Sequence, residues 1–251
     1  MPTSDSKNRL RLDDALVKAG LAPSRSRARD MVLRGTVTVD GLVADRPGRT
    51  IAAHARLAAD DPAAGYVSRA ALKLIAGLDA FGFDPAGLTV LDLGASTGGF
   101  TQVLLERSAA HVIPVDVGHG QMAAELAGDV RVTLLEGVNG RDLTRHHLGG
   151  RVVQGITCDV SFISLKLVLP PALGLAEPGA WGVFLVKPQF EVGRAGLGKD
   201  GVVAPQKGKE TADAIAAWLA RQAGWSLAGL IASPVTGGSG NREYLLGARH
   251  D

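Results

Sequence analysis

A glycine-rich turn between an apolar run and a helical pattern constrains the fold of this chain most. The sequence reads LTVLDL over residues 88–93, continues as GASTGGF, and then takes up a helical pattern. Gly94, Gly98 and Gly99 allow the backbone to bend sharply and to approach a ligand, while amide groups at the helix start point toward it. A strand, a glycine turn and a helix in this order are typical of a doubly wound α/β sheet.

The remaining apolar runs extend this pattern into a sheet. Helical patterns separate most of the strand candidates, which predicts a parallel sheet with helices on both faces. After the amphipathic segment 207–223, two strand candidates follow each other through a glycine-rich turn and predict an antiparallel hairpin. Seven strands with an antiparallel edge indicate a Rossmann-like methyltransferase fold rather than a dinucleotide dehydrogenase. The seven strand candidates are 88–93, 111–117, 130–135, 153–160, 180–187, 226–235 and 243–248.

The glycine turn and the next strand predict the cofactor. Ser96 and Thr97 interrupt the G-x-G-x-x-G spacing, which weakens a pyrophosphate-binding interpretation. Asp116 ends the next strand, 24 residues after Asp92, where a carboxylate accepts hydrogen bonds from ribose hydroxyls. A strand-end acid without a phosphate-binding Arg or Lys favours S-adenosylmethionine, and a nicotinamide or flavin cofactor is the alternative. The candidate cofactor-binding residues are Asp92, Gly94, Ala95, Ser96, Thr97, Gly98, Gly99, Phe100, Asp116 and Asp142.

Four charged residues lie within or next to apolar segments. Asp159 ends the fourth body strand, where a carboxylate either caps a helix from about Ile163 or belongs to a site. Lys187 directly follows an apolar strand, an unusual place for lysine unless its amine reaches solvent. Lys73 lies in a helical stretch, where a solvated position is the alternative, and Glu243 begins the last strand. Asp159 and Lys187 share the sheet's carboxyl edge, which predicts a charge-balanced cluster there.

The first 60 residues form a separate basic segment. They contain 11 Lys and Arg against 7 Asp and Glu, whereas residues 61–251 contain 16 against 18. Two short helical patterns and an Asp40-Gly41 hairpin signal predict a compact module too small for an enzyme site. A one-signed surplus on such a module predicts contact with a nucleic acid, and a solvated helix face is the alternative. The candidate RNA-binding residues are Arg11, Arg25, Arg27, Arg29 and Arg34.

Composition excludes several classes of protein. The single cysteine, Cys158, cannot form an intramolecular disulfide, and the N-terminus has no apolar stretch after its Lys and Arg residues. Both features predict a cytoplasmic protein. The uncharged run between Lys166 and Glu177 has ten residues, fewer than the roughly 17 that a membrane-spanning helix needs. We therefore expect no membrane association, and we expect no metal site.

Two resemblances connect these patterns to known families. The stretch RLDDALVKAGLAPSRSRARDMVLRGTVTVDGLV resembles the small RNA-binding domain first defined in a ribosomal small-subunit protein. Lys73, Asp159, Lys187 and Glu243 match the Lys-Asp-Lys-Glu catalytic tetrad of the FtsJ/RrmJ-type ribose 2′-O-methyltransferases in chain order. Together with SRAALKL, DLGASTGGFT, DVSFISL, LVKPQFE and GNREYL, these stretches resemble the TlyA family over nearly the whole chain.

The resemblance implies an activity and a domain arrangement. Members of this family methylate the ribose 2′-oxygen of cytidines in ribosomal RNA, so ribosomal RNA or a ribosomal subunit is the expected partner. The expected arrangement is an RNA-binding domain at 1–60, a linker at 61–66 and a methyltransferase domain at 67–251. The family is also labelled haemolysin-like, but a pore would require a spanning segment or an amphipathic helix with aromatic anchors.

The tetrad match also implies roles. Lys187 is expected to accept or orient the proton of the 2′-hydroxyl, and Asp159 to position Lys187. Glu243 and Lys73 are expected to hold the ribose and the neighbouring phosphate. A binding-only ribosome-assembly factor and a pseudouridine synthase are the alternatives. The glycine turn argues against both, because neither class needs it.

Overall fold

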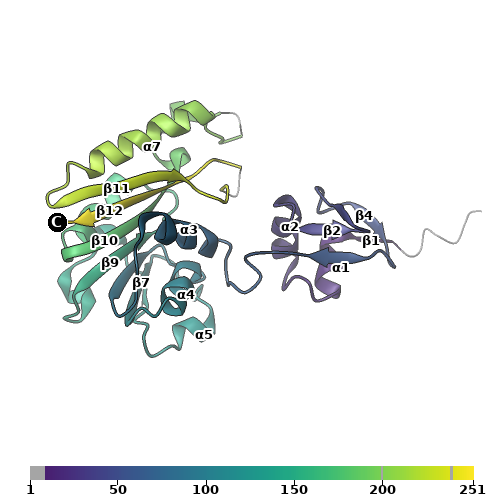
Figure 1. Cartoon of the computed structure of the whole chain (residues 1–251), viewed down its shortest axis with the longest axis horizontal. Coiled ribbons are helices and arrows are strands. Elements are labelled where there is room, and N and C mark those ends of the chain that lie inside the picture. The colour runs from purple at the N-terminus through teal and green to yellow at the C-terminus, as the bar shows by residue number, and fades with distance from the viewer. Residues whose placement is uncertain (1–8, 199, 238–239) are drawn as a thin grey trace, which may run out of the picture. The chain divides into compact units, whose positions relative to one another are not determined.

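The computed structural model describes residues 9–198, 200–237 and 240–251. The chain divides into two compact units, Met1–Gly65 and Tyr66–Asp251 (Figure 1). The first eight residues of the expected RNA-binding segment lie outside the described residues, as do residues 238–239 of the glycine-rich turn before Glu243.

The small unit packs two helices against short strands. Its core contains Leu12, Leu16, Met31 and Val37, all nearly or fully buried. Ser24 caps the second helix as expected, because its hydroxyl accepts a hydrogen bond from the Arg27 amide at 3.2 Å. The elements are β1 (Arg9–Arg11), α1 (Leu12–Lys18), α2 (Arg25–Leu33), β2 (Val37–Val39), β3 (Leu42–Val43), β4 (Thr50–Ala52) and β5 (Leu57–Ala59). Strand β1 pairs with β4, and β2 lies between β3 and β5.

The large unit contains the predicted seven-stranded sheet. Its strand order is β11-β12-β10-β9-β6-β7-β8. Strands β6 to β10 are parallel, while β12 runs antiparallel between β10 and β11 and so completes the predicted hairpin. The strands are β6 (Thr89–Leu93), β7 (His111–Asp116), β8 (Leu135–Glu136), β9 (Val153–Cys158), β10 (Ala176–Val186), β11 (Trp225–Ala232) and β12 (Tyr244–His250).

Two strands differ most from their predicted ranges. The candidate at 130–135 is reduced to β8, because Val130 is exposed and Val132 forms only an isolated bridge with Val112. Strand β10 begins at Ala176 rather than near residue 180, and a register shift before Trp181 accommodates the extra residues. Both differences lie away from the carboxyl edge that carries the charged residues.

Helices cover both faces of the sheet and create two cores. Alternation along β10 places Val183 and Leu185 in one core and Phe184 and Val186 in the other. The first core includes residues of α3 (Ala71–Phe81), α4 (Gly99–Glu106) and α5 (Ala124–Ala127). The second includes residues of α6 (Leu165–Leu173) and α7 (Pro205–Leu219). Within the described part of the chain, none of the helices combines the length and the apolar character that crossing a bilayer requires.

Candidate active site

Asp92 supports the glycine turn from below. Its carboxylate is fully buried and accepts hydrogen bonds from the hydroxyls of Thr101, at 2.7 Å, and Thr157, at 2.9 Å. These contacts join β6 to α4 and to β9. Burial raises the pKa of Asp92 to about 6, although both threonine hydroxyls oppose the shift. The residue predicted to bind the cofactor therefore lies beneath the turn and lines none of the cavities described below.

The glycine turn lies directly against the chain that follows β9. Gly94 has a φ of +79°, and a Cβ atom there would lie 2.8 Å from the carbonyl oxygen of Asp159. Gly98 has a φ of +94° at the start of α4, and its Cβ would lie 2.6 Å from Leu126 Cδ1. Both positions favour glycine for their positive φ, and Gly94 also requires it for space because its neighbour is backbone. Close packing at Gly94 brings the predicted cofactor turn next to a tetrad residue.

Asp116 organises a cavity of about 490 Å³ beside this turn. Its carboxylate accepts hydrogen bonds from the amides of Ser96 and Gly118, both at 2.8 Å. The cavity is also lined by Gly94 and Asp159. Val138, Asn139 and Gly140 line it too, and the sequence patterns did not single them out. Asp142 ends the 3-10 helix Gly140–Asp142, but its side chain is exposed and does not line this cavity.

The four tetrad residues form two ion pairs. Lys73 Nζ lies 2.6 Å from Glu243 Oε2, and both side chains are almost fully buried. Lys187 Nζ lies 2.7 Å from Asp159 Oδ1 and donates a hydrogen bond to Ser161 Oγ at 2.8 Å. The cluster has no net charge when all four groups are ionised, which makes its burial tolerable. Lys73 is therefore not the solvated helix residue that its position alone suggested.

Three cavities meet around these pairs. A large cavity of about 900 Å³ is lined by Lys73, Lys187, Glu243 and Ser161. A small one of about 180 Å³ is lined by Asp159, Ser161 and Lys187 on one side and by the glycine turn on the other. The turn residues that line it are Gly94, Ala95, Ser96, Thr97, Gly99 and Phe100. This small cavity shares lining residues with both larger ones, so it lies between the Asp116 cavity and the tetrad.

Asp159 is not a helix cap. Ser164 caps α6, its hydroxyl accepting a hydrogen bond from the Lys166 amide at 3.2 Å. Asp159 Oδ1 is buried and accepts no hydrogen bond from the described residues, so its contact with Lys187 is purely an ion pair. Cys158 lies in the core as expected, and burial raises the pKa of its thiol to about 12.

Sequence patterns missed several residues around Lys187. Ser161, Phe162, Gln189 and Phe190 all line the large cavity. Phe162 is 91% exposed and has a φ of +65°, and its ring lies 5.0 Å from that of Phe190. A bulky residue with a positive φ is an outlier, and such strained residues cluster at functional sites. The sequence could have indicated both phenylalanines through their positions, because each lies three residues after a tetrad member.

In the small unit, buried acids hold the predicted RNA-binding arginines. Asp13 is fully buried and accepts hydrogen bonds from Arg11 Nε at 3.0 Å and from Arg25 Nη2 at 3.4 Å. Arg25 also pairs with Asp14 at 2.8 Å. The hydrogen bond from Arg11 lowers the pKa of Asp13, against the effect of burial. Arg11 and Arg25 nevertheless remain about half exposed, at 45% and 54%, and can contact a partner.

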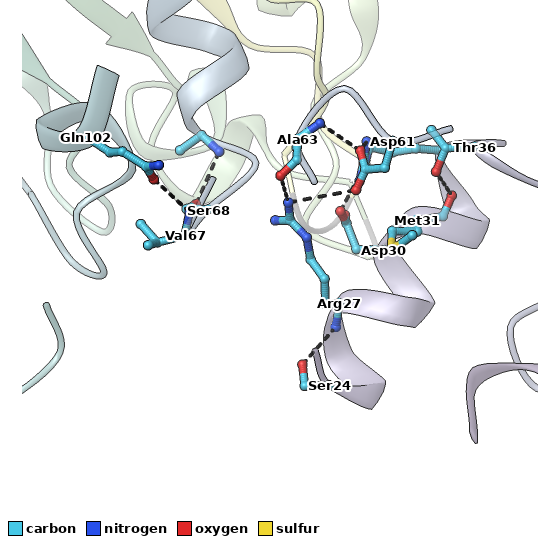
Figure 2. A network of polar contacts seen from close by, with 12 residues as sticks. Ser24, Arg27, Asp30, Met31, Thr36, Asp61, Ala63, Val67, Ser68 and Gln102 are labelled. Atoms are coloured by element: carbon cyan, nitrogen blue, oxygen red, sulfur yellow. Dashed lines mark hydrogen bonds and ion pairs between the residues drawn. The ribbon is translucent and has the colours of Figure 1, made fainter. Parts of the chain in front are cut away.

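Arg27 and Arg34 are more deeply placed. Both pair with Asp61. Arg27 also donates to the carbonyl of Ala63, and Figure 2 shows its contacts with Asp61 and Ala63. Burial alone would raise the pKa of Asp61, but the Arg34 guanidinium and the Ala63 amide lower it. Both arginine side chains are less than 15% exposed, so they fasten the segment at 61–63 to the small unit. Arg29 is exposed and forms no ion pair with any described residue.

Comparison with known proteins identifies both units. The model of FtsJ-like methyltransferases matches residues 66–250, and that of the S4 domain matches residues 10–57. The 16S/23S rRNA (cytidine-2′-O)-methyltransferase TlyA of Mycobacterium tuberculosis is 46% identical over 96% of this chain and 90% of its own length. Hemolysin A of Brachyspira hyodysenteriae is 34% identical over 94% of this chain and 98% of its own.

A solved structure shares the same architecture. A candidate hemolysin from Streptococcus thermophilus superposes with a TM-score of 0.75 at 36% identity and covers 97% of this chain and 89% of its own. The resemblance inferred from the sequence motifs is thus confirmed over both units. The chain belongs to the FtsJ-like methyltransferases, within the TlyA family that carries an S4 domain at its N-terminus.

Proposed function

We propose that this protein transfers a methyl group from S-adenosylmethionine to the ribose 2′-oxygen of a cytidine in ribosomal RNA. The observation that carries the proposal is the small cavity lined by both the glycine turn and Lys187, with Asp159 and Ser161 beside it. A cofactor on the turn and a ribose at the lysine would therefore meet. The relatives named for cytidine 2′-O-methylation support the substrate.

The residues present fit this cofactor. Asp116 and the turn would hold the adenosine part, because a carboxylate fixed by two backbone amides is ready to accept ribose hydroxyls. Asp159 lines both the Asp116 cavity and the small cavity, so its carboxylate would lie near the positively charged sulfonium while Oδ1 stays paired with Lys187. When bound, S-adenosylmethionine supplies a methyl group on positively charged sulfur.

Lys187 is the group that meets the 2′-hydroxyl. Its ammonium is held by Asp159 and Ser161, which leaves a third direction on Nζ for the substrate oxygen. A protonated Lys187 orients the oxygen lone pair, and a neutral Lys187 accepts the hydroxyl proton at Nζ. The pH profile of the single-turnover rate distinguishes these roles, since only proton acceptance requires the lysine to lose its proton.

The second ion pair lies deeper and has a positioning role. Lys73 and Glu243 line the large cavity with Lys187, but their 2.6 Å contact leaves both side chains more than 90% buried. They hold the ribose and the adjacent phosphate at the cavity floor and keep the cluster neutral. The large cavity accommodates the target nucleotide.

The S4 unit binds structured RNA through its exposed arginines. Arg11, Arg25 and Arg29 supply this contact, whereas Arg27 and Arg34 shape the unit from within. We assign the RNA-binding domain to residues 1–60 and the methyltransferase domain to 67–251, the first eight residues on the basis of sequence alone. Within the linker assigned to 61–66, Asp61 and Ala63 are held to the small unit by Arg27 and Arg34. A ribosomal substrate places this activity in the cytoplasm.

The proposal is tested with unmodified ribosomal subunits and methyl-labelled S-adenosylmethionine. We expect label on the 2′-oxygen of one or a few cytidines, located by mass spectrometry of nuclease fragments. Label on a base, or none with either subunit or the assembled ribosome, would contradict the proposal.

A further inference from the structure

Two loops carry the groups proposed to act on the 2′-oxygen. The first follows β9 and contains Asp159, Ser161 and Phe162, and the second follows β10 and contains Lys187 and Phe190. Because β9 and β10 are neighbouring parallel strands, their loops leave the sheet side by side. The Lys187 contacts with Asp159 and Ser161 join the loops near the sheet, and the phenylalanine pair joins them farther out.

Glu191 adds a third connection, between the segment after β10 and the end of the loop that follows β9. Its carboxylate accepts a hydrogen bond from Ser164 Oγ at 2.5 Å through Oε2, and one from the Leu165 amide at 2.8 Å through Oε1. The carboxylate thus occupies the start of α6, where it satisfies a free amide. Burial raises the pKa of Glu191 from its usual value, while both hydrogen bonds oppose that shift.

The two hydrogen bonds of Glu191, called the clamp from here on, restrain the loop that contains Phe162. Phe162 lies between the Lys187 contacts and the Glu191 contacts, and its positive φ persists only if the surrounding structure imposes it. Glu191 lines none of the three cavities, so it touches neither proposed substrate. Its two hydrogen bonds nevertheless determine how the loop bearing Ser161 lies against the loop bearing Lys187.

We propose that Glu191 is a positioning residue that holds the loop after β9 against the loop after β10 and thereby fixes Lys187 for methyl transfer. The inference rests on the proposed function, because it assigns Glu191 an effect through Lys187. Displacing a reacting group by about 1 Å can cost about 10²-fold in rate. Loss of the clamp should therefore affect the rate more than the binding of either substrate.

The test compares Glu191→Ala, Glu191→Gln and Ser164→Ala in the full chain. We expect Glu191→Ala to lower the single-turnover rate at saturating RNA and cofactor by about 10- to 100-fold. Both dissociation constants should stay within about threefold. Glu191→Gln keeps an acceptor for the Leu165 amide and should recover most of the rate, and Ser164→Ala should fall between the two. Asp129→Ala, which breaks an ion pair with Arg131 remote from the cavities, should leave the rate unchanged.

A double-variant cycle separates positioning from general stability. If Glu191 acts through Lys187, adding Glu191→Ala to Lys187→Ala should cause little further loss of rate. A lowered melting temperature with an unchanged rate in Glu191→Ala and Ser164→Ala would overturn the proposal. An equal loss in both backgrounds would also overturn it. Absence of methyl transfer by the wild-type protein would instead contradict the proposed function.

Discussion

Asp13 in the S4 unit and Asp92 in the methyltransferase unit are both fully buried, yet their pKa values shift in opposite directions. Asp13 lies between two arginines and has a lowered pKa, whereas Asp92 is held by two threonine hydroxyls and has a pKa raised to about 6. The charge of the partner therefore decides the direction, not burial alone.

The same difference separates the two units as a whole. In the S4 unit, Asp13 leaves Arg11 and Arg25 half exposed and directed by fixed hydrogen bonds. In the methyltransferase unit, Lys73 and Lys187 are at least 90% buried against carboxylates. Exposed, oriented cations suit a phosphate backbone, and buried, neutralised ones suit chemistry on a single atom. This contrast supports the proposal that the S4 unit binds the RNA and the methyltransferase unit carries out the chemistry.

The largest expected effect comes from Lys187 in the buried cluster. Lys187→Ala should lower the single-turnover rate by about 10²- to 10⁴-fold, because a positioned proton-handling group is lost from the transition state. Affinities for RNA and cofactor should change by a few fold at most. Lys187→Arg should not restore the rate, since a planar guanidinium cannot reproduce the ammonium contacts with Asp159 and Ser161. A rate close to wild type in Lys187→Ala would remove this lysine from the mechanism.

A smaller effect is expected at the cofactor cavity. Asp116→Ala should weaken cofactor binding by about 1.5–3 kcal/mol, the range for a hydrogen bond to a charged group. Calorimetry with S-adenosylmethionine measures this loss directly. RNA affinity should be unaffected, and Asp142→Ala serves as the matched control because its exposed side chain does not line the cavity. Unchanged cofactor affinity in Asp116→Ala would contradict the assignment of the adenosine site.

The exposed arginines should control the salt dependence of RNA binding. Replacing both Arg25 and Arg29 with Gln should reduce the slope of log affinity against log salt by roughly 1.4 to 1.8, or about 0.7 to 0.9 for each phosphate contact. Arg34→Gln is the contrasting variant. Because Arg34 is buried against Asp61, this substitution should lower the stability of the protein and leave the salt slope unchanged. Binding to unmodified subunits over a series of KCl concentrations provides the measurement. An unchanged slope in the double variant would contradict this docking surface.

The last expected effect is on the pH dependence of stability. Because the folded state raises the pKa of Asp92 from 3.8 to about 6, it binds this proton more tightly than the unfolded state does. Asp92 should therefore reduce stability as the pH rises from about 4 to about 6. Asp13, whose pKa is lowered, acts in the opposite sense and loses its contribution as the pH falls below about 4.

Chemical unfolding of wild type and Asp92→Asn across this range checks the sign. The variant lacks the titrating group, so its stability should fall less, or rise more, between pH 4 and 6. Identical slopes for the two proteins would show that Asp92 does not titrate as its burial requires.

Sequence patterns predicted the elements that depend on local or strand-end signals. Continuous apolar runs identified β6, β7, β9 and β10, and charged residues at strand ends singled out Asp159 and Lys187. Family resemblance then joined Lys73 and Glu243, which are 170 residues apart and meet only in the folded chain.

Other features depend on contacts that no local pattern specifies. An acid before a glycine turn can bind a ligand or support the turn, and only the position of Thr101 and Thr157 shows that Asp92 does the latter. Ser161 and Glu191 gain their roles from contacts across 26 or 27 residues of chain. Likewise, charge counting could not separate the exposed arginines from Arg27 and Arg34, because Asp61 lies in a segment expected to be a linker.

The most direct test of this division between the units is a single-turnover titration of unmodified ribosomal subunits. Lys187→Ala is compared with the Arg25→Gln/Arg29→Gln double variant. We predict that Lys187→Ala lowers the rate at saturating RNA and leaves the half-saturating concentration unchanged. The double arginine variant should raise the half-saturating concentration and reach the wild-type rate at saturation. A double arginine variant that lowers the saturating rate as strongly as Lys187→Ala, at an unchanged half-saturating concentration, would contradict the assignment of binding and catalysis to separate units.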